Sequence, residues 1–175
     1  IIFLNSHVSS SFPRPYLPNM IDICGVHVKE ASKLPNDIQN FLDSATDGAI
    51  VFSMGSFIKS KDFPENKREA FVRAFGKLKQ KVIWKYENET LPNKPDNVMI
   101  SSWVPQRDIL AHKNIKIFIT HGGLLSTTEA IMEGVPIISI PIFADQRLFF
   151  YFYNALYYNI IHQKVKHEIS RGQGF

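Results

Sequence analysis

The chain has 175 residues, of which 45% are apolar and 21% are charged, and its formal net charge is +4. This length suits one α/β domain with a buried core, and this composition excludes a disordered tail, a collagen-like repeat and a coiled coil. The basic residues are spread along the chain, which argues against nucleic acid as a partner, and the single cysteine, Cys24, excludes an internal disulfide and a cysteine-based metal site.

The first part of the chain predicts short extended segments around a linker. Residues Ile1–Asn5 form an apolar strand-like run, and the stretch Ser9–Pro18 carries three prolines that exclude a helix interior. Met20–Val28 alternates as a second extended segment. Asn36–Asp43 predicts a short helix, because polar residues suited to capping stand at its start and apolar residues share one face.

From residue 48 onward, apolar strands alternate with helices. Strands are expected at Ala49–Ser53, Val82–Tyr86, Val98–Ile100, Ile115–Thr120 and Val135–Ile140, and helices at Pro64–Gln80, Gln106–His112 and Leu125–Glu133. Continuous apolar strands separated by helices are typical of a parallel sheet covered on both faces. The sequence therefore predicts a doubly wound α/β domain, whose ligands bind beyond the carboxyl ends of the strands.

A glycine pair at one such strand end suits a phosphate group. His121 is followed by two glycines and the start of a helix, where a close backbone approach and unpaired N–H groups favour an anion. Ser126 adds a hydroxyl, and Glu129 could accept from the two hydroxyls of a ribose. A glycine-rich turn with a helix cap at Ser126 and a surface glutamate at Glu129 is the alternative. The dinucleotide and P-loop fingerprints are absent, which disfavours an NAD-dependent oxidoreductase.

Two further pairs follow strands. Trp103 offers a flat face for a base and Gln106 an amide for a base edge or a hydroxyl, although a core tryptophan with a helix-capping glutamine is an alternative. Asp145 and Gln146 could grip neighbouring sugar hydroxyls, or Asp145 could cap a following helix.

The order of these motifs resembles a known family. Residues 103–112 read WVPQRDILAH, residues 118–130 read FITHGGLLSTTEA, and residues 134–146 read GVPIISIPIFADQ. Together they are similar to the donor-binding signature of the UDP-glycosyltransferases, which include the animal UDP-glucuronosyltransferases, and the insect members are the most alike. The resemblance extends from Ile1 to about Leu148.

The resemblance implies the C-terminal half of a GT-B glycosyltransferase. Residues 1–19 would be the tail of the N-terminal acceptor domain and the linker, and residues 20–148 a Rossmann-like UDP-sugar-binding domain. Residues 149–175 depart from the family pattern and include the aromatic run Phe149–Tyr158. The family's catalytic base, a histidine oriented by an aspartate, belongs to the N-terminal domain, so no catalytic residue is assigned within this chain.

The resemblance also implies roles for single residues. Trp103 would stack on the uracil, Val104 would present backbone groups to it, and Gln106 and Glu129 would hold the ribose. Leu125 stands where some members have an asparagine. The remaining donor-site positions are His121, Gly123 and Ser126 at the diphosphate, Ser53 and Lys85 near the nucleotide, and Asp145 and Gln146 at the sugar hydroxyls.

The implied reaction is inverting transfer of glucose or glucuronate from a UDP-sugar to a small lipophilic acceptor, without metal or cofactor. A nucleotide-sugar-binding fragment without activity is the alternative. The family works in the endoplasmic reticulum lumen, held by one membrane anchor, and the apolar stretches Gly134–Ala144 and Leu148–Ile161 are too short to be that anchor. Asn88-Glu89-Thr90 is an N-glycosylation sequon in a polar stretch, expected on the surface, whether or not it is used.

Overall fold

A computed structural model describes residues 1–7, 14–143 and 145–147 of the chain. The chain divides into two compact units. The larger one, Gly25–Ile140, carries the main sheet, and the other takes in the described residues before 25 and after 140. The aromatic run Phe149–Tyr158 and the whole segment 149–175 lie outside the described residues, and the predicted boundaries at residues 19 and 148 stay predictions.

The smaller unit contains a two-stranded parallel ladder. Strand β1 (Ile2–Leu4) pairs with β2 (Met20–Asp22), and the Asp22 carboxylate accepts hydrogen bonds from the hydroxyls of Ser6 and Tyr16 at 2.5 and 3.2 Å. The extended segment predicted to continue to Val28 is therefore too long. The chain turns instead at Gly25, which has a φ of +87° and whose carbonyl accepts a hydrogen bond from the Val28 N–H at 2.9 Å.

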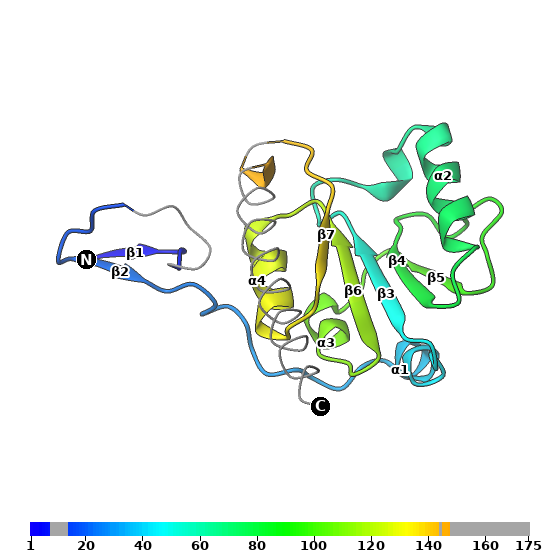
Figure 1. Ribbon diagram of the computed structural model, residues 1–175, viewed down its shortest axis with the longest axis horizontal. Coiled ribbons are helices and arrows are strands. Elements are labelled where there is room, and N and C mark those ends of the chain that lie inside the picture. The colour runs from blue at the N-terminus through cyan, green and yellow to red at the C-terminus, as the bar shows by residue number, and fades with distance from the viewer. Residues whose placement is uncertain (8–13, 144, 148–175) are drawn as a thin grey trace, which may run out of the picture. The chain divides into compact units, whose positions relative to one another are not determined.

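The larger unit is built on a five-stranded sheet with the order β5-β4-β3-β6-β7 (Figure 1). The strands are β3 (Ala49–Ser53), β4 (Lys81–Lys85), β5 (Val98–Ser101), β6 (Ile115–Thr120) and β7 (Ile137–Ser139). Every neighbouring pair is parallel. All five carboxyl ends therefore lie along one edge of the sheet, where ligands of open α/β sheets bind.

Helices cover both faces of this sheet. α1 (Asn36–Asp43), α3 (Gln106–Leu110) and α4 (Leu124–Met132) contribute to one apolar core, and α2 (Glu65–Phe75) contributes to a second core on the opposite face. The alternation of side chains along a strand explains the two cores, since Val51 of β3 belongs to the first and Phe52 to the second. The predicted doubly wound α/β architecture is confirmed.

Helix α2 ends five residues earlier than the sequence pattern predicts. The expected helix reached Gln80, but the structure ends it at Phe75. The reason lies just before β5, where the Asn97 side-chain amide donates to the carbonyls of Phe75, Leu78 and Gln80 at 2.9, 3.2 and 2.9 Å. These bonds satisfy backbone groups of a turn that leaves Leu78 exposed instead of on the buried face. The other helices and strands of the larger unit differ from prediction by at most two residues at either end.

Helix α1 has the predicted bounds but not the predicted cap. Pro35 occupies the cap position, and no side chain caps the first turn. At its other end, the last residue Asp43 accepts a hydrogen bond from Gln39 at 3.0 Å and lies 3.2 Å from His112 Nε2. The Gln39 bond first, and the His112 bond second, hold the pKa of Asp43 below its ordinary value.

Candidate functional site

Polar residues end all five strands of the sheet. Ser101, Lys85, Ser53, Thr120 and Ser139 are the last residues of β5, β4, β3, β6 and β7. The register pairs Lys85 with Ser101, Ser53 with Thr120, and Thr120 with Ser139. Two residues earlier, β4, β3 and β6 each carry an apolar residue of the core under α1, α3 and α4. Because side chains alternate, the polar row faces the same side of the sheet as α3 and α4.

The His121 ring is enclosed by two glycines just beyond this row. A Cβ added at Gly55 would lie 2.6 Å from His121 Cε1, and one added at Gly123 would lie 2.5 Å from His121 Nε2. Thr120 Oγ1 lies 3.3 Å from His121 Nδ1, and Ser53 Oγ accepts a hydrogen bond from the Gly55 N–H at 3.3 Å. The ring therefore fills the space between the loop after β3 and the start of α4.

The start of α4 has the features of an anion-binding helix end. Gly123 is its cap residue, no side chain caps it, and its first turn carries no acidic residue. Ser126 lies in that first turn and is half-buried. Backbone N–H groups at such an end carry partial positive charge, which favours a phosphate. The alternative prediction of Ser126 as a helix cap is wrong, because the cap position is Gly123.

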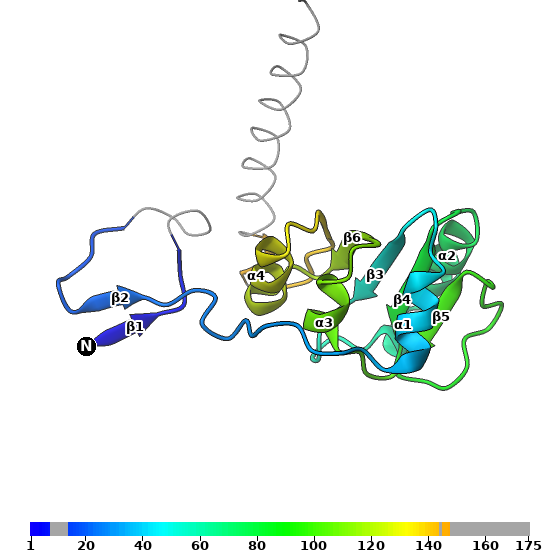
Figure 2. The ribbon, with the colours of Figure 1, turned by 90° about the horizontal axis from the view of Figure 1, so that it is seen from below.

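Gln106 and Glu129 meet across two helices. Gln106 begins α3 and Glu129 lies in the middle of α4, and Gln106 Nε2 donates to Glu129 Oε2 at 2.7 Å. The two helices lie side by side (Figure 2). The two residues that the sequence analysis assigned to the ribose are 23 positions apart and form one contact. We call this pair the Gln106–Glu129 clamp.

Trp103 presents an open aromatic surface. Its side chain follows β5 and is 69% exposed, whereas its neighbour Val104 is 5% exposed. The Trp103 carbonyl accepts a hydrogen bond from Ser101 Oγ at 2.5 Å, which fixes the backbone there. Trp103 as a core tryptophan is therefore excluded. The fully buried tryptophan of the core is Trp84.

Lys85 is engaged within the protein. Lys85 Nζ pairs with Glu87 Oε1 at 2.8 Å, and both side chains are 14% exposed. The second oxygen of Glu87 accepts the Lys61 N–H at 3.2 Å, so the pair ties β4 to the 3₁₀ turn at Ser60–Asp62. Glu87 was not among the residues predicted for the site. Its place two residues after Lys85, on the same side of an extended chain, is the signal that could have indicated the pair.

Asp145 and Gln146 belong to the smaller unit. The Asp145 side chain is exposed, and Gln146 is buried with Oε1 accepting from the N–H groups of Ile142 and Phe143 at 2.8 and 3.1 Å. Gln146 thus braces the loop that precedes it. Their assignment to sugar hydroxyls stays a prediction.

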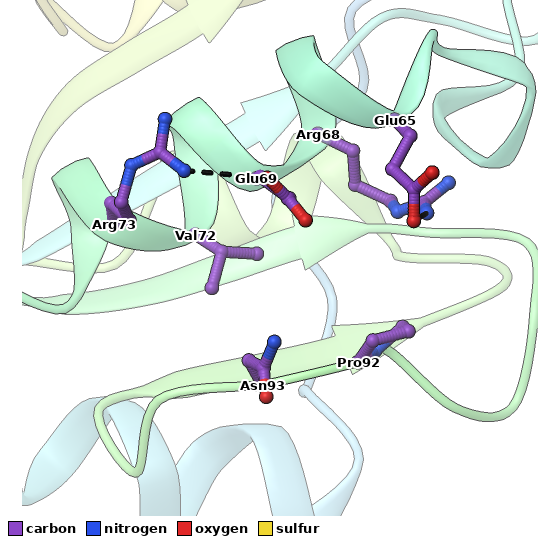
Figure 3. A pocket seen from close by; sticks show the side chains of 7 residues that line it. All are labelled: Glu65, Arg68, Glu69, Val72, Arg73, Pro92 and Asn93. Atoms are coloured by element: carbon purple, nitrogen blue, oxygen red, sulfur yellow. Dashed lines mark hydrogen bonds and ion pairs between the residues drawn. The ribbon is translucent and has the colours of Figure 1, made fainter.

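A separate pocket of about 210 Å³ lies beside α2 (Figure 3). Two ion pairs of that helix line it, Glu65–Arg68 at 3.7 Å and Glu69–Arg73 at 3.4 Å. Both glutamates are exposed, and ion pairs in such positions contribute little to stability. None of the predicted site residues lines this pocket.

Metal ligation, membrane insertion and glycosylation concern other features of the described residues. Within residues 1–7, 14–143 and 145–147, no group of three or more His, Cys, Asp or Glu side chains is arranged to hold a metal ion. Over the same ranges, no helix has the length and apolar character to cross a membrane. Asn88 is exposed in the loop between β4 and β5, as expected of the sequon.

Residues 1–152 match the family described as UDP-glucoronosyl and UDP-glucosyl transferase. The chain is 50% identical over 147 residues to UDP-glycosyltransferase UGT5 of Dactylopius coccus, covering 84% of this chain and 28% of that protein. It is 39% identical over 147 residues to UDP-glucuronosyltransferase 2A2 of Homo sapiens, covering 83% and 27%. The chain thus spans under a third of the length of these relatives.

Solved structures share the fold. A UDP-glucosyltransferase from Polygonum tinctorium capable of glucosylating indoxyl aligns with a TM-score of 0.61 and 24% identity, over 78% of this chain and 32% of that one. Os79 from O. sativa, solved in complex with UDP, aligns with a TM-score of 0.57 and 25% identity, over 67% and 27%. The α/β unit therefore has the fold of one part of these larger transferases.

Proposed function

Because this chain belongs to the UDP-glucoronosyl and UDP-glucosyl transferase family, we propose that its larger unit binds the UDP part of a UDP-sugar donor. The contact that carries the proposal is the Gln106–Glu129 clamp, which joins the start of α3 to α4 on one face of the sheet. A carboxylate fixed by an amide can accept from both hydroxyls of a ribose. Os79, a relative in fold, is described in complex with UDP.

Other residues are proposed to contact the uracil and the diphosphate of UDP. The 69% exposed Trp103 ring stacks on the uracil, and the backbone of Val104 reads its edge. The diphosphate lies at the start of α4, where the backbone of Gly123 and the hydroxyl of Ser126 donate to it. His121, enclosed by its two glycines, donates to the same oxygens. Ser53 and Lys85, both in the polar row at the strand ends, lie near the nucleotide in this proposal.

The chemistry that this arrangement serves is displacement at the anomeric carbon of the sugar. An acceptor hydroxyl loses its proton to a base, its oxygen forms the new glycosidic bond, and the bond to the UDP oxygen breaks with inversion. Negative charge then develops on the departing diphosphate, where His121 and the α4 N–H groups stabilise it. We assign the base and the acceptor pocket to other parts of the full-length transferase, since this chain spans 28% of its relative UGT5.

The names of the relatives also support a proposal for the sugar that is transferred. The relatives include a glucosyltransferase and glucuronosyltransferases, so glucose and glucuronate are both candidate sugars. A small lipophilic acceptor and action on the lumenal side of the endoplasmic reticulum, through an anchor elsewhere in the full-length protein, complete the proposal.

Calorimetry of the chain with UDP, UMP and NAD tests the proposed site. UDP should bind more tightly than UMP or NAD, because only UDP presents both a uridine and a terminal diphosphate. His121→Ala should weaken UDP by about 1–3 kcal/mol, the cost of losing a hydrogen bond to a charged group. UMP binding should change much less. Equal affinity for UMP and UDP would remove the diphosphate from the site, and an unchanged affinity in His121→Ala would make that histidine structural.

A further inference from the structure

We propose that Arg107 and Glu133 form a positioning pair that sets the geometry of the Gln106–Glu129 clamp. The inference rests on the proposed function, because it assigns a role to the pair only in holding the ribose site. Arg107 Nη2 lies 2.7 Å from Glu133 Oε1, the same distance that separates Gln106 Nε2 from Glu129 Oε2. Both contacts join α3 to α4, one to a residue within α4 and the other to its C-cap residue.

The spacing of the four residues makes the second contact a brace for the first. Gln106 and Arg107 are consecutive on α3, whereas Glu129 stands one helical turn before Glu133, which closes the end of α4. A shift or rotation of α3 against α4 that broke one contact would alter the other. Arg107 is thus linked through the backbone to Gln106, and Glu133 is linked in the same way to Glu129.

Arg107 is fixed on more than one side. Its side chain is 20% exposed and that of Glu133 is 25% exposed. Arg107 Nε donates to the Lys29 carbonyl at 3.0 Å, and next to it Asp108 accepts the Ser32 N–H at 2.7 Å. Among the described residues, Arg107 Nη1 is buried with no hydrogen-bond partner. A guanidinium held in this way acts as a rigid strut, since its planar group fixes the directions of its hydrogen bonds.

The orientation of helix α3 depends on contacts of this kind. The helix has five residues, and a helix of that length has no stability of its own. Its orientation is therefore decided by packing of its buried Ile109 and Leu110 and by its polar contacts to α4. Holding two ribose hydroxyls at once requires the amide and the carboxylate to keep a fixed separation, and small displacements are costly at such sites.

The test compares UDP with 2′-deoxy-UDP, which lacks one hydroxyl that the clamp would hold. Wild-type chain should bind UDP about tenfold or more tightly than 2′-deoxy-UDP, because the missing hydroxyl forfeits a hydrogen bond to a charged group. In Glu133→Gln and in Arg107→Met, UDP affinity should fall several-fold while 2′-deoxy-UDP affinity changes little. The ratio between the two ligands should therefore fall toward one. A residue that only stabilises the fold would not change this ratio.

Two further variants make the test specific. Glu69→Gln removes the Arg73–Glu69 ion pair of α2, drawn as a dashed line in Figure 3, and should leave both affinities and their ratio at the wild-type values. Arg107→Glu with Glu133→Arg reverses the pair and should recover the ratio in part, even where the single variants lose stability.

The outcomes separate the two proposals. If Glu133→Gln keeps the wild-type ratio, or weakens both ligands equally, the positioning role is overturned while the UDP site stands. If the wild-type chain fails to bind UDP, the proposed function is overturned instead. If the wild-type chain binds both ligands equally, Gln106 and Glu129 do not hold the ribose and the pair has nothing to position.

Discussion

At the residue scale, Gly55 and Gly123 leave room for the ring of His121 because neither has a side chain. His121 lies where a Cβ of Gly55 or of Gly123 would be, at 2.6 and 2.5 Å from its ring atoms. Gly55 also has a φ of +80°, a conformation that side-chain-bearing residues rarely adopt. The absence of a Cβ at Gly55 and Gly123 thus leaves the space that the His121 ring occupies.

Gly55→Ala should therefore both strain the backbone and displace the His121 ring. We expect a loss of about 1–3 kcal/mol in the free energy of unfolding and a marked loss of UDP affinity. Gly134→Ala is the matched control, since Gly134 has a φ of +66° but no atom within 4 Å of an added Cβ. That control should show the backbone cost alone, with UDP affinity retained. Urea unfolding and calorimetry measure both quantities, and wild-type UDP binding by Gly55→Ala would contradict the steric argument.

At the element scale, α2 is held by aromatic packing and ended by a distant amide. The Phe75 ring lies 5.5 Å from that of Phe52 and 5.6 Å from that of Trp84, in edge-to-face arrangements. Asn97 then donates to the carbonyl of the last helical residue and to two carbonyls that follow the helix. Phe75 is 3% exposed, while Leu78, three residues later, is 36% exposed. The end of α2 separates a core position from a surface one.

Phe75→Ala should destabilise the chain by about 3–5 kcal/mol, the usual cost of deleting a buried aromatic ring. Leu78→Ala should change stability by less than about 0.5 kcal/mol, as surface substitutions do. Urea unfolding of both variants decides whether α2 ends where the structure ends it. A cost for Leu78→Ala comparable to that for Phe75→Ala would mean that the longer helix predicted from sequence is the correct one.

At the scale of the whole molecule, donor binding and sugar transfer are separate requirements. The larger unit gathers the proposed donor contacts along the carboxyl edge of one sheet. Transfer also needs an acceptor within attack distance and a base beside its hydroxyl. We propose that both belong to other parts of the full-length transferase, so this chain should bind the donor without transferring its sugar.

The 175-residue chain by itself should bind UDP-sugar without transferring the sugar. A general base alone contributes roughly 10²–10⁴-fold to rate, and the acceptor would also lack a binding site. Incubation with UDP-glucose or UDP-glucuronate and a phenolic acceptor, followed by chromatography, should show no glycoside. Supplying the N-terminal domain of an insect relative, together with that relative's sequence after Gln146, should restore turnover. Glycoside formed by the unmodified chain would require a base within this half.

The sequence by itself determined the α/β architecture, because continuous apolar strands and intervening helices are local patterns. It also located the strand ends and, through the motifs at Trp103, His121 and Glu129, the loops of the candidate site. Local patterns carry this information since backbone periodicity and the conformational freedom of glycine depend on neighbouring residues.

Contacts between distant segments were decided only by the tertiary structure. It brought Gln106 to Glu129, paired Arg107 with Glu133, engaged Lys85 with Glu87, and ended α2 through Asn97. It also left Trp103 exposed and put Trp84 in the core. The physical reason is that each of these outcomes depends on which faces of two elements meet when the sheet and helices pack, and that orientation is set by the whole core rather than by any local run of residues.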